Sequence, residues 1–209
     1  MGLIIALNKG RIFKECLPLL AACDIAPDED PDASRKLIFE TRTGGHQIIV
    51  ARSADVPTYV EYGVADFGIT GKDTILEYGG AMGFYEMLDL GIGKCRMMTA
   101  GPVGVPEPSG VLRVATKFIN ITKDYYRQQG RQVSLIKLSG AMEIAPLLNL
   151  SDTIVDIVDT GNTLVANGLE ARATICDIST RLIVNRASMK TKFDEVNALM
   201  GQLEAVVKP

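Results

Sequence analysis

Short apolar runs alternate along the chain with amphipathic segments, a pattern typical of α/β proteins. The apolar and β-branched runs predict strands at residues 3–7, 48–51, 67–70, 97–100, 113–115, 133–137, 153–158 and 181–185. Apolar residues at helical spacing predict helices at residues 11–23, 56–62, 72–78, 119–129, 143–148 and 193–207. Residues 101–110 hold three prolines and three glycines and are predicted to form a loop. The predicted fold class is therefore α/β.

The proline-rich loop also marks a place where one lobe could give way to another. A length of 209 residues allows either one large domain or two small lobes that share a ligand cleft. The final helix could return to the first lobe, so that the chain crosses twice. We therefore expect lobe I at residues 1–92 and 185–209, and lobe II at residues 93–184.

Composition and charge exclude several classes of function. Apolar residues make up 47% of the chain and charged residues 22%, as in an ordinary globular protein. The net charge of -3 argues against broad binding to nucleic acid or to a membrane surface, and no apolar run reaches the roughly 20 residues that span a bilayer. The cysteines form no C-x-x-C pair and no secretory signal is present, which indicates free thiols and a cytoplasmic location. The single histidine, His46, excludes a multi-histidine metal site and is predicted to lie exposed in a hairpin turn.

The strongest local signal is the turn that follows the predicted strand at residues 153–158. The strand ends in acidic residues, and a Thr-Gly-Asn-Thr sequence then begins a helix. Backbone N–H groups, two hydroxyls and the helix dipole at such a turn can hold a phosphate, while a carboxylate at the strand end suits ribose hydroxyls. An ordinary N-capped helix is the alternative. The candidate residues are Asp156, Asp159, Thr160, Gly161, Asn162 and Thr163.

Glu143 lies upstream, at the turn after the predicted strand 133–137. Parallel strands would bring this turn and Asp156 to the same edge of a sheet, where the two carboxylates could share one ribose. From spacing alone, the preferred interpretation is a solvated glutamate that the helix dipole favours.

A second cluster is basic. Lys9 and Arg11 flank a glycine directly after the first predicted strand, and further cations lie at turns as Arg35 and Lys72. Cations are disfavoured at the positive end of a helix dipole, and a bound polyanion would resolve that conflict. Arginine is also well suited to bidentate contact with phosphate. Scattered surface cations are the alternative.

The chain resembles ATP phosphoribosyltransferase in its short form, over essentially its whole length. The resemblance is carried by residues 8–11, 33–37, 54–63, 65–73 and 89–95, and most specifically by residues 143–164. In that last segment the family pattern has Glu, a Gly, the strand Asp and then Thr-Gly-x-Thr-Leu. The chain departs from it once, with Asn149 at the Gly position. Because Asn tolerates positive φ better than most residues, we expect the turn to survive.

The resemblance implies an enzyme that transfers phosphoribose from phosphoribosyl pyrophosphate (PRPP) to N1 of the adenine of ATP, the first step of histidine biosynthesis. It implies a two-lobed fold like that of type II periplasmic binding proteins, with the active site in the interlobe cleft. Mg²⁺ is the implied cofactor, held mainly by substrate phosphates and not by a protein metal motif. The expected assembly is a homodimer core joined to a regulatory subunit that resembles histidyl-tRNA synthetase, since we expect no C-terminal regulatory domain.

The resemblance also implies a role for each candidate residue. PRPP would be bound by Glu143 and Asp156 at the ribose and by Asp159, Thr160, Gly161, Asn162 and Thr163 at the 5-phosphate. The catalytic cations at the pyrophosphate and triphosphate would be Lys9, Arg11 and Arg35, and ATP would meet Gly71, Lys72 and Asp73. Two alternatives remain at this stage: a bilobed anion- or solute-binding protein without chemistry, and a phosphoribosyltransferase for another base.

Overall fold

The chain folds into two compact units in a computed structural model that describes residues 2–31, 33–79 and 83–207. The first unit combines Met1–Gly93 with Ser179–Pro209, and the second is Lys94–Ile178. The first crossing lies between residues 93 and 94, next to the expected position. The second comes before strand β11 (Thr180–Asn185), whereas the sequence placed it between residues 184 and 185, at the end of that strand. β11 belongs to the first unit because it pairs with two strands of that unit's sheet.

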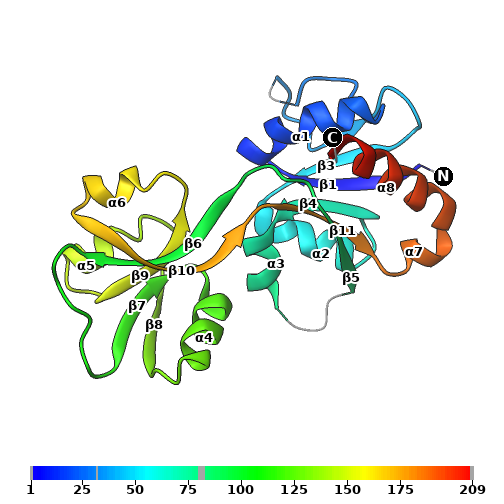
Figure 1. Cartoon of the computed structure of the whole chain (residues 1–209). Helices are drawn as coiled ribbons and strands as arrows, with labels where there is room; N and C mark the ends of the chain where they lie inside the picture. The colour runs from blue at the N-terminus through cyan, green and yellow to red at the C-terminus, as the bar shows by residue number, and fades with distance from the viewer. Residues whose placement is uncertain (1, 32, 80–82, 208–209) are drawn as a thin grey trace. The chain divides into compact units, whose positions relative to one another are not determined.

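A six-stranded sheet forms the centre of the first unit, in the order β2-β3-β1-β4-β11-β5 (Figure 1). Strands β1, β3 and β4 run parallel, while β2 and β11 run antiparallel to their neighbours. The other strands of this sheet are β1 (Ile4–Asn8), β2 (Ile38–Glu40), β3 (Gln47–Ala51), β4 (Phe67–Gly71) and β5 (Phe84–Asp89). The helices of the first unit are α1 (Arg11–Ala22), η1 (Ser53–Asp55), α2 (Val56–Glu61), α3 (Lys72–Tyr78), α7 (Ser188–Thr191) and α8 (Phe193–Val207).

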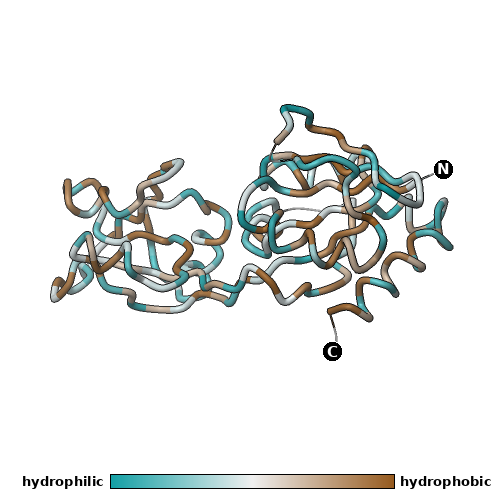
Figure 2. Tube along the Cα trace, turned by 90° about the horizontal axis from the view of Figure 1, so that it is seen from above, coloured by the Kyte–Doolittle hydropathy of each residue, from teal (hydrophilic) through white to brown (hydrophobic). Residues whose placement is uncertain are grey.

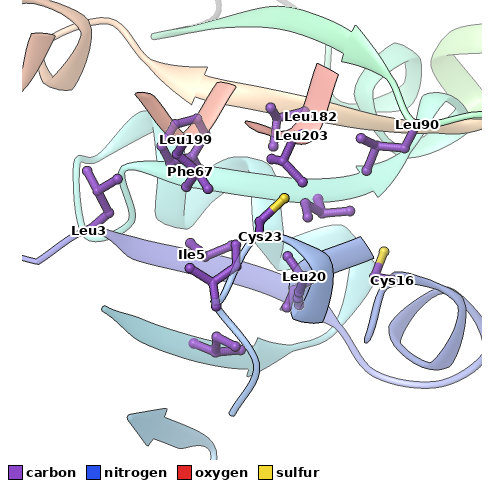
Figure 3. Packing of buried hydrophobic residues seen from close by; sticks show 14 of the residues in the cluster. Leu3, Ile5, Cys16, Leu20, Cys23, Phe67, Leu90, Leu182, Leu199 and Leu203 are labelled. Atoms are coloured by element: carbon purple, nitrogen blue, oxygen red, sulfur yellow. The ribbon is translucent and has the colours of Figure 1, made fainter. Parts of the chain in front are cut away.

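Alternation along the central strands sends apolar side chains to both faces of this sheet. On one face, Ile5 and Leu182 pack with the buried residues of α1 and α8, and Figure 3 shows this layer from close by. On the other face, the neighbouring residues Ala6 and Ile183 pack with α2 and α3. Near the C-terminus, Figure 2 shows hydrophobic and hydrophilic segments in alternation along α8, as its predicted amphipathic pattern requires.

The second unit has a five-stranded sheet in the order β10-β6-β9-β7-β8 (Figure 1). Its strands are β6 (Cys95–Pro102), β7 (Leu112–Thr116), β8 (Val133–Lys137), β9 (Thr153–Val158) and β10 (Leu169–Ile178). Its helices are α4 (Ile119–Gln128), α5 (Ile144–Leu147) and α6 (Asn162–Ala166). Successive side chains of β9 again face opposite sides of the sheet and pack in two separate cores. Ile154 packs in the cluster that contains residues of α5 and α6, and Val155 packs in the cluster that contains residues of α4.

The two sheets repeat one strand order. In each, the first parallel strand lies between the second and the third, and an antiparallel strand follows the third: β3-β1-β4-β11 in the first unit and β8-β7-β9-β6 in the second. No repeat is evident in the sequence, so the likeness lies in topology alone. In each unit this order brings the carboxyl ends of three parallel strands to one edge, where open α/β sheets bind ligands.

Three strands and two short helices, α7 and the three-residue η1, were not predicted. β2 has only three residues, and β5 is exposed along most of its length, so neither has a clear apolar alternation. β10 contains two register shifts, after Ala171 and after Thr174, which break its period. The helix α7 is a single turn of four residues. The predicted strands and helices are otherwise present, with ends displaced by a residue or two.

His46 is the one histidine, and the prediction that it is exposed is wrong. Its turn does join two antiparallel strands, β2 and β3, but the imidazole is half-buried and its Nδ1 accepts a hydrogen bond of 3.0 Å from the backbone N–H of Leu3. Partial burial lowers the pKa of His46, because a charged imidazolium is disfavoured away from water. His46 is therefore a structural residue that accepts a hydrogen bond at the start of β1.

The cysteines form no disulfide, in agreement with the prediction: two are buried and two are half-buried. Burial raises the pKa of the Cys16 thiol to about 12, which keeps it protonated and unreactive. In the part of the chain that the structure describes, no helix has both the length and the apolar character needed to span a bilayer.

A buried carboxylate joins the C-terminal segment to the sheet of the first unit. Asp66, only 4% exposed, accepts hydrogen bonds from the backbone N–H of Ile4 at 2.8 Å and the hydroxyl of Ser188 at 2.6 Å. It also pairs with the ammonium of Lys192 at 2.8 Å. One side chain thus links the start of β1, the start of β4 and the segment that holds α7.

Candidate functional site

A cavity of about 180 Å³ lies in the second unit, at the carboxyl end of β9. Two carboxylates, Glu143 and Asp156, line it together with most of the acidic turn that follows the strand. The complete lining is Met98, Ala100, Glu143, Ile154, Asp156, Ile157, Val158, Asp159, Thr160, Gly161, Thr163 and Leu164. The two stretches that the sequence singled out, thirteen residues apart, therefore meet at one cavity.

Asp156 occupies a position of β9 that alternation would give to the core. Ile154 and Val158, two residues before and after it on the same face of β9, are both buried in the core that contains residues of α5 and α6. The side chain between them is nevertheless an acid. Asp156 is half-buried, and its Oδ1 accepts a hydrogen bond of 2.8 Å from the backbone N–H of Ile157. A carboxylate on the inward-facing side of a strand, next to a cavity, is more readily explained by ligand binding than by a contribution to stability.

The turn after β9 has the backbone form expected of an anion-binding loop. Gly161 is left-handed, with φ of 83°, a conformation that glycine adopts without strain, and α6 begins directly after it. The hydroxyl of Thr160 accepts a hydrogen bond of 3.4 Å from the backbone N–H of Asn162. Six of the seven residues predicted to bind PRPP line the cavity, whereas Asn162 does not.

The segment that carries Glu143 is shaped by two non-glycine residues with positive φ. Ala141 precedes Glu143 with φ of 51°, and Asn149 follows α5 with φ of 55°. The second value confirms the expectation that Asn149 adopts a positive φ. The turn between α5 and β9 is therefore formed with a non-glycine residue at its positive-φ position.

Arg113 clamps this segment to β9 from the neighbouring strand β7. Its Nη1 donates to the carbonyl of Asn149 at 2.8 Å, and its Nε and Nη2 donate to the two carboxylate oxygens of Asp152 at 3.2 and 2.6 Å. These hydrogen bonds lower the pKa of the Asp152 carboxyl below its ordinary value. Their contribution to stability is therefore present above the ordinary carboxyl pKa and is lost as the pH falls through the lowered one.

In the first unit, the predicted cations gather at the carboxyl edge of the sheet. Lys9 follows β1, Arg11 opens α1, and Lys72 follows β4. Arg35 lies at the same edge although it does not follow a parallel strand. Two residues after it, the carbonyl of Leu37 accepts a hydrogen bond of 2.8 Å from the backbone N–H of Val50, near the end of β3. Because β2 runs antiparallel to β3, residues just before β2 lie where β3 ends.

The cations at this edge differ in their partners. Arg11 pairs through its Nε with Glu15 at 2.7 Å, and Lys72 pairs with Glu86 of β5 at 2.6 Å. Arg35 is exposed and makes no ion pair or hydrogen bond with any residue that the structure describes. A β-carbon at Gly71 would lie 2.1 Å from the carboxylate oxygen of Asp73, so the glycine makes room for that side chain.

Arg52 is a further cation at this edge that sequence reasoning did not name. It follows β3 directly, is exposed, and precedes the short helix η1. The signal was available, since a strand was predicted to end at residue 51 and a basic residue comes next. The carboxyl ends of all three parallel strands in this unit are thus followed by a basic residue.

The residues that the structure describes contain no group of three His, Cys, Asp or Glu side chains arranged to hold a metal ion. The cavity nevertheless offers carboxylate oxygens from Glu143, Asp156 and Asp159. Oxygen donors of this kind suit Mg²⁺, which keeps several waters and takes its other ligands from substrate phosphates.

Comparison with known proteins identifies the family. A family model described as HisG, ATP phosphoribosyltransferase, matches residues 52–205. The ATP phosphoribosyltransferase of Teredinibacter turnerae is 60% identical over 205 residues, which cover 98% of this chain and 96% of that protein. The enzyme of the same name from Pseudomonas aeruginosa is 56% identical over 206 residues, covering 99% and 97%.

Solved structures agree with these relatives. The ATP phosphoribosyl transferase (HisG:HisZ) complex of Thermotoga maritima contains a chain that is 34% identical with a TM-score of 0.86, and the match covers 99% of this chain and 98% of that one. A protein of Archaeoglobus fulgidus, 8% identical with a TM-score of 0.59, shares the fold over 99% of this chain and 77% of its own. From the motifs at the cavity, the mixed α/β fold and these matches, it follows that the chain belongs to the ATP phosphoribosyltransferase family.

Proposed function

We propose that the chain transfers the phosphoribosyl group of PRPP to N1 of the adenine of ATP, giving N1-(5-phosphoribosyl)-ATP and pyrophosphate in the first step of histidine biosynthesis. The observation that carries the proposal is the cavity in which Glu143, Asp156 and the turn at residues 159–163 meet, in a member of this family. A pocket with two carboxylates beside a glycine turn suits a sugar phosphate.

PRPP would bind with its ribose against the carboxylates of Glu143 and Asp156, which accept hydrogen bonds from hydroxyl groups. Its 5-phosphate would lie on the turn, where Thr160 and Thr163 supply hydroxyls and Gly161 lets the backbone approach closely. Asn162, which does not line the cavity and whose backbone N–H donates to the hydroxyl of Thr160, would then support the turn.

Displacement at the anomeric carbon passes through an oxocarbenium-like state while negative charge grows on the leaving pyrophosphate. The bond from that carbon to the pyrophosphate oxygen breaks as the bond to adenine N1 forms. Cations that hold the developing charge stabilise the transition state more than the ground state. Lys9, Arg11 and Arg35 are the residues we assign to this task, and Arg52 stands at the same sheet edge.

Adenine N1 already carries a lone pair, so its attack needs no strong general base. The chain's contribution is therefore orientation and electrostatic stabilisation. Gly71, Lys72 and Asp73 are assigned to ATP because they follow β4 at the basic edge. Glu143 and Asp156 would supply oxygen ligands to Mg²⁺, and the metal when bound neutralises pyrophosphate charge.

We further propose that the two units are the lobes of a type II periplasmic-binding-protein-like fold. The repeated strand order and the two crossings support this assignment. The partner we propose is a regulatory subunit like HisZ, resembling histidyl-tRNA synthetase, bound to a homodimer of this chain. The support is that the similar Thermotoga maritima structure is a HisG:HisZ complex.

The direct test is to incubate the purified chain with ATP, PRPP and Mg²⁺, alone and with a HisZ-like subunit. We expect a new absorbance and a product mass equal to ATP plus one phosphoribosyl group, and loss of product when a chelator removes Mg²⁺. GTP in place of ATP should give no product. If neither preparation forms the adduct although PRPP binds, the chain is a binding protein and the proposal is wrong.

Asp156→Asn should weaken binding of PRPP at least tenfold while ATP binding changes little, because an amide can accept from only one of its two terminal atoms. Calorimetric titration of each substrate, with 5-phosphoribose as a fragment of PRPP, measures the difference. Asp177→Asn, an exposed aspartate of β10, serves as the matched control. Equal losses for PRPP and ATP would contradict the assignment of Asp156 to the ribose.

A further inference from the structure

The two carboxylate oxygens of Glu15 accept hydrogen bonds from two different parts of the chain. Its Oε1 accepts a hydrogen bond of 2.7 Å from the Nε of Arg11, one helical turn earlier in α1. Its Oε2 accepts a hydrogen bond of 2.8 Å from the backbone N–H of Gly93, 78 residues away in the sequence. The carboxylate therefore bridges the side chain at the start of α1 and the last residue of the first unit before the chain crosses.

An exposed Arg–Glu pair one turn apart normally contributes little, because the two side chains must be ordered and water screens their charges. The contact with Gly93 orders the Glu15 carboxylate independently of Arg11. A backbone N–H does not move as a side chain does, and Gly93 is held in a left-handed conformation with φ of 61°. The direction of the Glu15 carboxylate is thus set by the fold, and Arg11 receives a fixed partner.

We propose that Glu15 is a positioning residue, which holds the guanidinium of Arg11 in the orientation needed to bind a phosphate group of the leaving pyrophosphate. This rests on the proposed function, in which Arg11 is one of the catalytic cations. Contact through Nε fixes the plane of the guanidinium, whose terminal Nη groups make bidentate contacts with phosphate. Glu15 also offsets the unfavourable position of a cation at the positive end of α1.

The bridge requires a carboxylate of this length. Arg11 and Gly93 donate to different oxygens of Glu15, whereas glutamine has an acceptor oxygen at only one of these two positions and an NH₂ group, which only donates, at the other. Aspartate keeps both oxygens but is shorter by one methylene group. Glu15→Gln is therefore a sharp test, because it preserves size and removes only the second acceptor and the charge.

Glu15→Gln and Glu15→Ala are each expected to lower kcat about tenfold, since a misdirected catalytic group loses much of its effect. Inhibition by added pyrophosphate should weaken to a similar extent, while KM for ATP stays within twofold. The thermal midpoint should fall by no more than about 4 °C, because the ion pair with Arg11 is screened by water and the backbone N–H of Gly93 loses one acceptor. Asp124→Ala is the matched control, because it breaks another exposed helical ion pair, with Arg127 at 3.1 Å, and should leave kcat unchanged.

A double-mutant cycle separates positioning from a general structural effect. If Glu15 acts through Arg11, then Arg11→Ala and the double variant Arg11→Ala/Glu15→Ala should have the same kcat. Independent, multiplying losses would overturn the inference, as would a kcat for Glu15→Ala equal to or above that of the wild type. If Arg11→Ala alone keeps the wild-type rate and the wild-type inhibition by pyrophosphate, the role of Arg11 in the proposed function is wrong. That result is distinct from one in which Arg11 is needed but Glu15 does not position it.

Discussion

Replacing Arg35 with alanine should slow turnover by about 100-fold or more, because a donor aimed at developing charge contributes that much to a transition state. Arg35 lies at the carboxyl edge of the first sheet, just before β2, and is exposed to solvent. It makes no ion pair or hydrogen bond within the described part of the chain, so its guanidinium has no protein partner to give up when it binds a phosphate.

The rate of adduct formation measures this effect, with PRPP and ATP both saturating. Arg35→Lys should recover only part of the loss, since an ammonium keeps the charge but cannot make the planar bidentate contact. The adjacent Lys36 provides the control: it pairs with Glu29, so Lys36→Ala should turn over at nearly the wild-type rate. An Arg35→Ala variant that retains more than half of the wild-type kcat would remove Arg35 from the mechanism.

Replacing Asp66 with alanine should cost about 3 kcal/mol of unfolding free energy, because it removes the partner of a buried ion pair and leaves neighbouring donors unsatisfied. The value lies at the low end for such a change, since Lys192 is 25% exposed and can turn toward water. The loss should fall on the first unit, whose strands β1 and β4 and segment around α7 all meet at this carboxylate.

Scanning calorimetry should show a midpoint about 10 °C lower for Asp66→Ala, given the usual dependence of the midpoint on stability for a chain of this size. Ser188→Ala is the matched comparison, because it removes one of the three groups that contact Asp66 and should cost only about 1 kcal/mol. A midpoint that Asp66→Ala leaves unchanged would show that this buried pair contributes nothing to stability.

The cavity of the second unit could be predicted because its signals are local. An acid at the end of a β-branched strand, followed by a glycine turn, indicates a ligand loop from sequence alone, and Asp156 and Gly161 both lie at the cavity. The backbone of Asn149 could be anticipated for the same reason, since a residue's tolerance of positive φ is an intrinsic property.

The basic edge of the first unit was harder to predict because it depends on contacts between distant segments. Arg35 comes to the edge through β2, a strand too short to have a pattern of its own. The partners of Arg11 and Lys72 are equally non-local, since Gly93 and β5 are needed to hold Glu15 and Glu86. The crossing before β11 was misplaced because an apolar strand fits a sheet in either unit equally well.

The repeated strand order means that one scaffold position carries opposite chemistry in the two halves of the molecule. The turn after the third parallel strand is basic in one half, at Lys72, and acidic with hydroxyls in the other, at Asp159 and Thr160. Such a division makes the two halves separately adjustable in evolution. Under the proposed function, changes after β4 would alter recognition of the acceptor while β9 and its turn keep the donor, so that specificity could change without rebuilding the site for the sugar phosphate.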